Sequence, residues 1–562
     1  MAALTERDTL KTPITAAPVP ITISARQGAT HWNREELFAA GALTIGELLA
    51  NVPGATLMAA GFMLAPTVVA WHGDPGGIRV FLDGVEREEV TLRNGGITDF
   101  VLIPLWSLED VTLEETAGEL RVHLRTWHVE RTTPATRTDV LTGSENLNLF
   151  RGYFGKRAAN GAVIQLAAQQ VSSSSIPGMD GDALGAMARV GWAGGAWSVD
   201  GTWLRQGIER TVGGRYLVPD VVDAGQAPDG LAVPAYSGAT SLSYLRIGWR
   251  SAVDEGAWAQ FVASTLGSTL KASKATGASA TDSVDAAASQ AQYTARAGIN
   301  RGRVRLGLTT RLKSALGSTD VAPAGTAEFV DSTYALAATA GKRFSGASVW
   351  DVRGRVTPFT WLRLTATAGT SQRSGGAGTT SGTSVDASLR IRGIWIGGGV
   401  RRVDDGVVLG PVELDTTINA VTVPRGSAVT FNLVAPIWRG WMLQTDALRW
   451  DSATPYRPQT QVRSRVWFAS SFSEKFPRAN FHLHAEVNQE YRSRLFVPAG
   501  SDGLGQVAKA YSVFGSLLEI RIGSGVLSWS YRDMSGLNYA TFPGFVMPKI
   551  TSVYGLRWEF WN

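Results

Sequence analysis

From about residue 138 to the C-terminus, apolar residues recur at every second position, in about 20 segments of roughly 8–15 residues with no helical period. In the clearest segment, residues 302–312, Val304, Leu306 and Leu308 share one face of an extended strand, and polar side chains share the other. This pattern indicates a large antiparallel sheet whose strands each have one apolar and one polar face.

The links between these segments alternate in length. Turns of about two or three residues, such as 300–302 and 523–525, alternate with long stretches rich in polar or small residues. The long stretches are 209–238, 271–287, 313–329, 371–383, 404–424, 491–509 and 535–548. Short turns at one end of the strands and long loops at the other are typical of a transmembrane β-barrel. A soluble sandwich or propeller lacks such a regular alternation of short and long connections over roughly 400 residues, so a barrel is favoured.

The tryptophans point the same way. Of the 19 Trp residues, 15 follow residue 137, and many lie near the ends of predicted strands. Membrane barrels carry aromatic residues at both lipid–water interfaces, which explains this distribution.

Composition excludes several other classes. The chain has no Cys, which rules out disulfides, thiolate zinc sites, iron–sulfur clusters and a cysteine nucleophile. No run of about 18 apolar residues predicts a transmembrane helix. Residues 1–8 lack the apolar core of a secretory leader, so we expect a barrel whose leader is absent from this sequence. The net charge of +5 comes from scattered basic residues, so no nucleic-acid partner is expected.

Charge divides the chain near residue 137. Residues 1–137 contain 11 Lys and Arg against 17 Asp and Glu, a net charge of −6, whereas residues 138–562 carry +11. An acidic small domain therefore precedes a basic large one.

The acidic part is predicted to be a small α+β domain. Asn33 followed by Glu36 predicts a capped helix start, and residues 44–49 predict a second helix that ends at Pro53 and Gly54. Strands are predicted over residues 78–82, 111–114 and 119–124.

Five ordered segments of this part form a larger pattern. They are PVPITI at 18–23, ELFAAG at 36–41, TIGELLANVPG at 44–54, IRVFLDGV at 78–85 and IPL at 103–105. In order and spacing they resemble the plug domain of TonB-dependent outer-membrane receptors, and residues 146–161 resemble the first barrel hairpin after that plug. The fold class expected is thus mainly β: a large antiparallel transmembrane β-barrel of about 20–22 strands, filled by a small N-terminal α+β plug.

The resemblance implies three regions: an N-terminal segment at 1–17, a plug at 18–137 and a barrel at 138–562. It also implies that extracellular loops and the plug apex capture a ligand, and that an inner-membrane TonB-type protein energises uptake by pulling on an N-terminal motif. With a plain linker as the alternative, the best candidate for that motif is the run Asp8, Thr9, Leu10, Lys11, Thr12, Pro13 and Ile14.

Two features qualify the resemblance. The family places a Gly-rich segment between the last two plug strands, but residues 112–119 join them directly, so a shortened plug is expected. Of the 22 strands of the family barrel, about 20 are counted directly. The others are expected within 330–356, which is too long for one span, or within 404–430.

Arginines recur on the polar face of the predicted strands. They are Arg303, Arg305, Arg311, Arg363, Arg390, Arg392, Arg463, Arg465 and Arg557. One interpretation is an electrostatic funnel for an anionic ligand, such as a carboxylate or catecholate chelate. The other, which we favour, is that these guanidiniums pair with the carboxylates of the acidic plug. The two are compatible.

His482, His484 and Glu486 fall on one face of a predicted strand. Such a row is able to bind a metal ion or a ferric chelate. A polar lumen wall is favoured, because adjacent side chains on one face of a strand are about 7 Å apart. No resident cofactor is expected, and no catalytic motif appears, so an enzyme is disfavoured.

These patterns together predict an outer-membrane receptor that binds and imports a scarce nutrient, either a chelated metal or another small molecule. The alternative is a non-energised plugged barrel that acts as a scaffold or passive channel. The expected partners are outer-membrane lipid, a small-molecule ligand that is anionic or a metal chelate, and an inner-membrane TonB-type energy-coupling protein. The barrel is expected to be a monomer.

Overall fold

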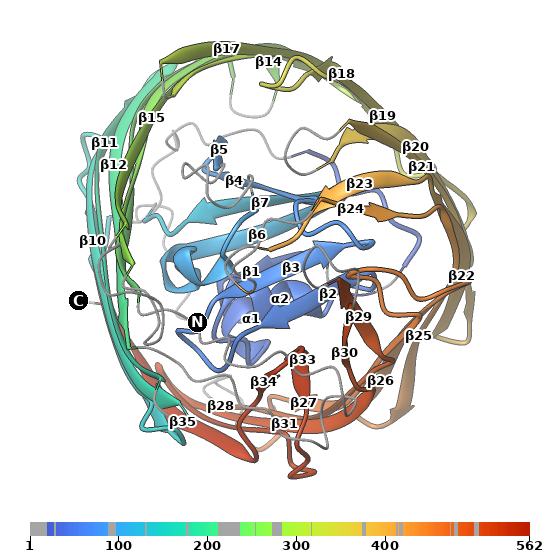
Figure 1. Cartoon of the computed structure of the whole chain (residues 1–562). Helices are drawn as coiled ribbons and strands as arrows, with labels where there is room; N and C mark the ends of the chain where they lie inside the picture. Colours follow the sequence, from blue (N-terminus) through green and yellow to red (C-terminus); the bar gives the residue numbers. More distant parts are fainter. Residues whose placement is uncertain are drawn as a thin grey trace.

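The structure is a computed structural model. It describes residues 20–26, 28, 30–87, 97–129, 132–175, 179–211, 236–252, 255–272, 284–315, 317–373, 378–411, 414, 420–472, 474–476, 481–498 and 505–561. A closed barrel surrounds a small N-terminal domain, the plug, and Figure 1 looks along the barrel axis. Within the described ranges, no helix is long and apolar enough to span a membrane.

The plug contains two short helices and a mixed sheet. Its elements are β1 (His31–Asn33), α1 (Arg34–Ala39), α2 (Ile45–Ala50), β2 (Ala55–Ala59), β3 (Thr67–Trp71), β4 (Ile78–Leu82), β5 (Val85–Arg87), the 3-10 helices η2 (Phe100–Leu102) and η3 (Leu105–Ser107), β6 (Leu108–Glu115) and β7 (Leu120–Thr126). Five of these strands form a sheet in the order β1-β6-β7-β4-β5, and β2 pairs with β3.

Local sequence explains how these elements begin and end. The capping box predicted for α1 is present: the Asn33 side chain accepts from the Glu36 amide, and the Glu36 carboxylate accepts from the Asn33 amide. The direct link between β6 and β7 is also present, since the Thr116 amide donates to the carbonyl of Glu119 and closes a tight turn. Strands β6 and β7 are therefore joined directly, as the sequence predicted.

Twenty-two antiparallel strands close the barrel, which confirms the predicted fold class. They are β8 (Ala135–Gly143), β9 (Asn148–Arg157), β10 (Ala162–Ser175), β11 (Met179–Gly194), β12 (Trp197–Arg210), β13 (Tyr236–Arg250), β14 (Gly256–Ala272), β15 (Val284–Arg301), β16 (Val304–Ala315), β17 (Ser318–Val330), β18 (Tyr334–Lys342), β19 (Ser348–Phe359), β20 (Leu362–Gln372), β21 (Thr379–Ile391), β22 (Ile394–Val403), β25 (Gly426–Trp438), β26 (Trp441–Trp450), β27 (Thr460–Ser470), β28 (Phe481–Arg492), β31 (Tyr511–Ile522), β32 (Gly525–Arg532) and β35 (Thr551–Trp561). Pairing of β35 with β8 completes the ring. The first barrel strand begins at Ala135, slightly before the boundary expected at residue 138.

The barrel exterior carries the predicted apolar face. Leu306 and Leu308 of β16 are 47% and 69% exposed. Exposed aromatic side chains lie near strand ends, among them Trp192, Trp197, Trp361, Trp438, Trp441 and Trp558. An apolar outer surface bounded by aromatic residues suits a lipid bilayer, and the closed ring of paired strands leaves no free sheet edge in it.

One predicted loop was wrong. Residues 313–329 were expected to be a long connection, but β17 occupies most of this stretch and pairs with both β16 and β18. Small residues hid its alternation: Val321 is 48% exposed on the outer face, while its neighbour Ala322 is buried. Residues 330–356, one of the two places where extra strands were expected, contain β18 and most of β19.

Three hairpins leave the barrel rim and cover the plug. They are β23 (Gly406–Leu409) with β24 (Ala420–Val423), β29 (Leu495–Pro498) with β30 (Gly505–Ala508), and β33 (Ala540–Phe542) with β34 (Phe545–Val546). Val408, Leu495 and Phe542 from these hairpins are fully buried in one cluster with Met58 and Val68 of the plug. The hairpins therefore close over the β2–β3 end of the plug by apolar packing (Figure 1).

Candidate functional site

Two sectors of the contact between the plug and the barrel differ in chemistry. Outside them, Glu35 and Glu47 of the plug pair with Arg521 and Arg532 of the barrel. We call its contact with strands β9–β14 the apolar sector. In this sector the plug residues Trp106 and Trp127 belong to one buried cluster with Tyr153, Met187 and Leu204 of the barrel. Trp127 and Tyr153 meet edge to face, with ring centroids 5.5 Å apart. Burial of apolar surface therefore holds this side of the plug.

We call the contact of the plug with strands β16–β22 the ionic sector. At its centre, Arg121 of β7 places its guanidinium 2.9 Å from Glu114, 2.6 Å from Glu119 and 2.6 Å from Asp351 of β19. Arg353, also on β19, lies 2.6 Å from Glu114 and 3.0 Å from Asp351. Plug and barrel each supply one cation and at least one anion, so the charges alternate across the contact.

The cations around Glu114 and Glu119 lower the pKa of both buried carboxyls. Burial alone would raise the pKa of Glu114, but the guanidiniums of Arg353 and Arg121 and a hydrogen bond from His123 hold this pKa well below its ordinary value. The pKa of Glu119 is also lowered, because Arg79 and Arg121 outweigh its burial. Burial lowers the pKa of His123, so its imidazole favours the neutral form.

A second pair of plug carboxylates extends the ionic sector toward the β18–β19 turn. Glu86 and Glu119 both contact Arg79 of the plug, at 2.5 and 3.2 Å. Arg343, in that turn, lies 3.5 Å from Glu86 and 3.6 Å from Glu119. Arg311 of β16 lies 3.5 Å from Glu86.

The N-terminal end of the plug also belongs to the ionic sector. Arg26 forms an ion pair with Glu115, and Arg401 of β22 contacts the other oxygen of the same carboxylate at 3.1 Å. The Ile21 amide donates to Glu328 of β17 at 3.2 Å, and the Ser388 hydroxyl donates to the Ala25 carbonyl at 2.8 Å. Residues 21–26 thus run along the barrel wall before the plug sheet begins.

The β4–β5 turn is fixed where the two sectors meet. Asp83 has a positive φ of 49°, and its carboxylate accepts from the Thr126 amide at 3.0 Å and from the Tyr244 hydroxyl at 2.9 Å. Arg246 donates to the Asp83 carbonyl at 2.9 Å, and Arg296 donates to the Gly84 carbonyl. Burial would raise the pKa of Asp83, but Arg246 and Arg189 lower it.

The arginines predicted from sequence lie on the lumen side or in turns, with varied partners. Toward the plug, Arg311 contacts Glu86, Arg463 donates to Asn51 at 2.6 Å, and Arg557 lies over Phe38, 5.0 Å from the ring centroid. The others have barrel partners or lie in a turn: Arg303 contacts Asp331 (3.2 Å), Arg305 contacts Glu328 (3.9 Å), Arg363 and Arg390 lie over Trp395 (5.3 and 5.8 Å), Arg465 donates to Gln444 (2.8 Å), and Arg392 lies in the β21–β22 turn with φ 49°.

Sequence reasoning did not identify the centre of the ionic sector. It assigned cations to the barrel and anions to the plug, whereas Arg121 is a plug cation and Asp351 a barrel anion. One local signal was present in the sequence. Asp351 and Arg353 are two residues apart on β19, so their opposite charges lie next to each other on the same face of the strand.

The predicted histidine row is a mixed polar wall. His484 lies 3.6 Å from Glu486, on β28. The part of the chain that the structure describes contains no group of three or more His, Asp or Glu residues placed to hold a metal ion. Among these described residues, His482, His484 and Glu486 are therefore not placed to hold a metal ion together. The candidate coupling run Asp8–Ile14 lies outside the described residues.

Two cavities flank the plug. One, of about 700 Å³, lies on the ionic side between the plug and strands β13–β19. The other, of about 260 Å³, lies between the plug helices and strands β26–β32. Both have polar and apolar walls, and the larger falls within the range typical of small-molecule sites.

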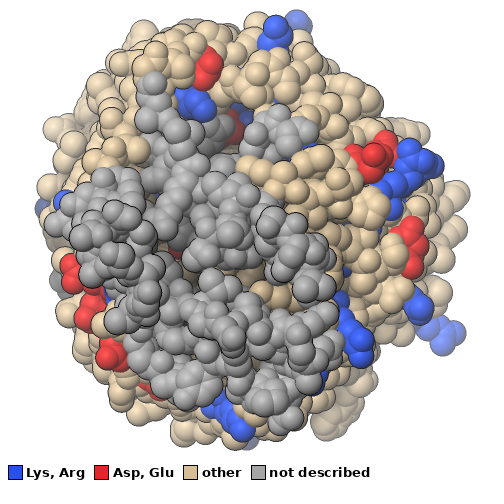
Figure 2. Space-filling model, in the orientation of Figure 1, with Lys and Arg blue, Asp and Glu red and all other residues tan. Residues whose placement is uncertain are grey.

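The described charged side chains on the rim of the barrel are not sorted by sign. Figure 2 shows described Lys, Arg, Asp and Glu side chains of both signs scattered around the edge of this face.

No protein-family model and no curated protein sequence matches the chain. Solved structures do match in fold. The FrpB iron transporter from Neisseria meningitidis aligns with a TM-score of 0.70 at 10% identity, over 95% of this chain and 100% of that one. The siderophore receptor PirA from Acinetobacter baumannii aligns at 0.68 and 10% identity, over 95% and 98%. The ferric enterobactin receptor PfeA from Pseudomonas aeruginosa aligns at 0.70 and 10% identity, over 96% and 100%. The chain therefore has the plug-in-barrel fold of outer-membrane iron and siderophore receptors.

Proposed function

We propose that the chain is an outer-membrane receptor that binds a small nutrient and imports it with energy supplied by an inner-membrane TonB-type protein. The observation that carries the proposal is the path of residues 21–26, which lie in the ionic sector and are held there by Glu328, Ser388 and Glu115. A pull on the chain before residue 20 would reach these contacts first.

The two sectors would respond differently to such a pull. Glu115 is paired with both Arg26 and Arg401. If Arg26 is pulled away, Arg401 is the one cation of the two that still compensates this buried carboxylate, so the remaining contact is less stable. In the apolar sector, contacts would not break one after another in this way, because the stabilisation is spread over a continuous buried surface. We propose that the plug moves away from β16–β22 first and widens the 700 Å³ cavity while the apolar sector holds.

The ligand is proposed to be a scarce small molecule, with a chelated metal as one class. The structural neighbours PirA and PfeA are described as receptors for a siderophore and for ferric enterobactin, which supports a chelate. At 10% identity their likeness to this chain is one of fold, so the ligand class is proposed on the shared fold together with the cavities beside the plug.

A passive plugged barrel is the second candidate. The three hairpins that bury Met58 and Val68 favour it, because apolar packing covers the end of the plug at which the family captures ligands. The short β6–β7 turn favours it for the same reason.

Deletion of residues 8–14 tests energised import against the passive barrel. Cells of the native host would be starved of iron, and uptake of radioactive iron from their own spent medium would be measured with and without a proton uncoupler. Energised import predicts that the deletion abolishes the uncoupler-sensitive uptake while ligand binding to purified protein persists. Deletion of residues 2–6 is the matched control and should leave uptake unchanged. Uptake that is insensitive to both the deletion and the uncoupler would favour the passive barrel.

A further inference from the structure

The 700 Å³ cavity has more cations than anions on its walls. Ten Lys and Arg residues and five Asp and Glu residues line it. The lining extends from Glu255, beside the β13–β14 turn, to Arg343, in the β18–β19 turn. These turns lie at opposite ends of the barrel, because consecutive strands are antiparallel. The cavity therefore follows the barrel wall over much of its height.

Two glycines of the barrel wall leave space that the Trp258 side chain fills. Gly298 of β15 pairs with Trp258 of β14 on one side and with Gly307 of β16 on the other. A Cβ added to Gly298 would lie 2.7 Å from Cζ2 and 2.8 Å from Cε2 of Trp258, and one added to Gly307 would lie 3.9 Å from that Cζ2. The indole thus lies over the glycines, which leaves its other face toward the cavity.

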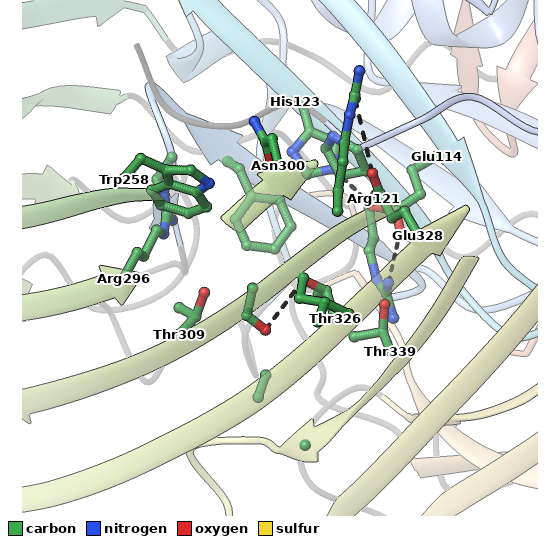
Figure 3. Close-up of a pocket in the computed structure, with 18 of the residues that line it drawn as sticks. Glu114, Arg121, His123, Trp258, Arg296, Asn300, Thr309, Thr326, Glu328 and Thr339 are labelled. Atoms are coloured by element: carbon green, nitrogen blue, oxygen red, sulfur yellow. Dashed lines mark hydrogen bonds and ion pairs between the residues drawn. The ribbon is translucent and has the colours of Figure 1, made fainter. Parts of the chain in front are cut away.

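Polar side chains surround Trp258 and the two glycines. The strand register places Arg296 opposite Thr309, and Asn300 opposite Arg305. Thr326 of β17 pairs with both Gly307 and Thr339. Figure 3 shows Arg296 beside Trp258, with Thr309, Thr326 and Thr339 following one another across the wall. The wall therefore offers a cation, an aromatic face and several hydroxyls within one patch.

Arg296 is the cation of this patch that lacks a carboxylate. It is only 9% exposed, and its guanidinium donates to the Gly84 carbonyl and, at 3.5 Å, to the Gln260 side chain. Among the described residues, no carboxylate lies within ion-pair distance of it. Burying a guanidinium without an anion is costly, so an anionic ligand at this point would be favoured.

The plug contributes a second aromatic surface. Phe81 and His123 line the cavity opposite the wall, with their rings stacked at 5.0 Å and an angle of 10°. The guanidiniums of Arg79 and Arg311 also lie over Phe81, 4.9 and 5.2 Å from its ring centroid. The plug side of the cavity is therefore both aromatic and cationic, which suits a flat anion.

We infer that this cavity binds a small planar organic anion, an aromatic carboxylate, with its ring against Trp258 and its carboxylate on Arg296. Thr309, Thr326 and Asn300 hydrogen-bond to further polar substituents of the ring. This assigns a ligand class to the receptor proposed above and rests on that proposal only for the direction of transport. Binding itself requires neither the energy-coupling run nor a partner protein.

The test is calorimetric titration of the purified full chain with benzoate and with its neutral isostere benzamide. Benzoate should bind saturably, and benzamide should bind about tenfold more weakly or worse, because it loses the charge-assisted hydrogen bonds to Arg296. Arg296→Gln should weaken benzoate binding by about the same factor and leave benzamide nearly unchanged. Arg439→Gln, an exposed residue of the β25–β26 turn, is the matched control and should change neither.

Three results would overturn the inference: no saturable benzoate binding, equal affinity for benzoate and benzamide, or unchanged benzoate affinity in Arg296→Gln. Because Arg296 also contacts the plug at Gly84, that variant should first be checked for plug assembly by trypsin digestion. If it fails to assemble, Trp258→Leu decides, since it alters only the wall; unchanged affinity for both probes would then contradict the site. Saturable benzoate binding, together with uptake that neither the deletion of residues 8–14 nor the uncoupler changes, would remove energised import and keep the site.

Discussion

The two sectors around the plug hold it by different physics. In the apolar sector, Met187 and Leu204 pack against the plug with almost no exposed surface, and stability there scales with buried area. In the ionic sector, Arg121 and Arg353 hold Glu114 and Asp351 through short, directional contacts. The comparison teaches that one barrel holds the same plug by packing that depends on buried area on one side and by contacts that depend on charge on the other. The larger cavity lies on the second side.

The largest effect is expected from Arg353→Met. The substitution keeps most of the side-chain volume but leaves Glu114 and Asp351 to share Arg121, so it should cost about 3–5 kcal/mol of plug stability. Trypsin cleavage within the plug, measured against urea concentration, reports this loss. Arg402→Met is the control: Arg402 is 55% exposed and 3.9 Å from Asp404, so a change of about 0–1 kcal/mol is expected. Equal effects of the two substitutions would mean that the ionic sector does not hold the plug.

The double variant Arg353→Met with Asp351→Leu sharpens this result. It removes one buried charge of each sign, so it should recover part of the stability lost in Arg353→Met alone. The same urea and trypsin assay measures the recovery. Additive losses would show that Arg353 and Asp351 act independently.

Leu204→Ala tests the apolar sector. Leu204 is 4% exposed and packs in the cluster shared with the plug, so the cavity left by this substitution should cost about 2–5 kcal/mol in the same assay. The loss should not depend on pH, because the cluster contains mainly apolar side chains. Leu308→Ala, at a position 69% exposed to lipid, is the control and should have little effect on the plug. If the loss of plug stability in Leu204→Ala depended on pH, the two sectors would not be held by different interactions.

Acid should loosen the ionic sector and spare the apolar one. The pKa values of Glu114, Glu115 and Glu119 are lowered in the folded protein, so the unfolded chain binds protons first as pH falls. Their contribution is complete above the ordinary value of 4.5 and is lost as pH falls through the lowered values. His123 acts in the same direction, as does His72, whose imidazole lies 3.3 Å from Arg401 of β22. Folding lowers both pKa values, so these histidines destabilise the folded protein below their ordinary value of 6.5.

Hydrogen exchange of the plug at pH 7 and at about pH 4 tests this difference, since exchange reports local opening. Faster exchange at low pH is expected around Glu114 and Glu115, with little change around Trp106. Uniform acceleration over the whole plug would contradict separate sectors.

Salt should have the smallest effect. At about 1 M salt the screening length is about 3 Å, but buried pairs such as Arg121–Glu114 are screened far less than exposed ones. We expect plug stability to fall by less than about 1 kcal/mol, at the level of surface ion pairs. A larger loss, measured by urea titration at low and high salt, would show that water reaches the ionic sector.

Much of the fold could be predicted because it depends on local patterns. The capping box of Asn33 and Glu36 and the alternation of Leu306 and Leu308 are present in the structure as the sequence implied. Strand β17 was missed because Ala, Gly and Thr show little hydropathy contrast; only its pairing with β16 and β18 reveals it.

Less of the candidate site could be predicted. Alternation assigned Arg303 and Arg311 to the same face of one strand, yet Arg303 contacts Asp331 of the barrel and Arg311 contacts Glu86 of the plug. A period of two specifies the face of a strand but not the height at which a side chain meets the plug. That height depends on strand tilt and on how the plug sits in the lumen.

By itself, the sequence determined the barrel, the acidic plug and the opposite charges of the two, because hydropathy and charge are properties of each residue and its near neighbours. Only the tertiary structure decided that one side of the plug is apolar and the other ionic, and that Gly298, Trp258 and Arg296 meet beside a cavity. The physical reason is that these groups come from different strands or domains, and closure of the barrel around the plug brings them within contact distance.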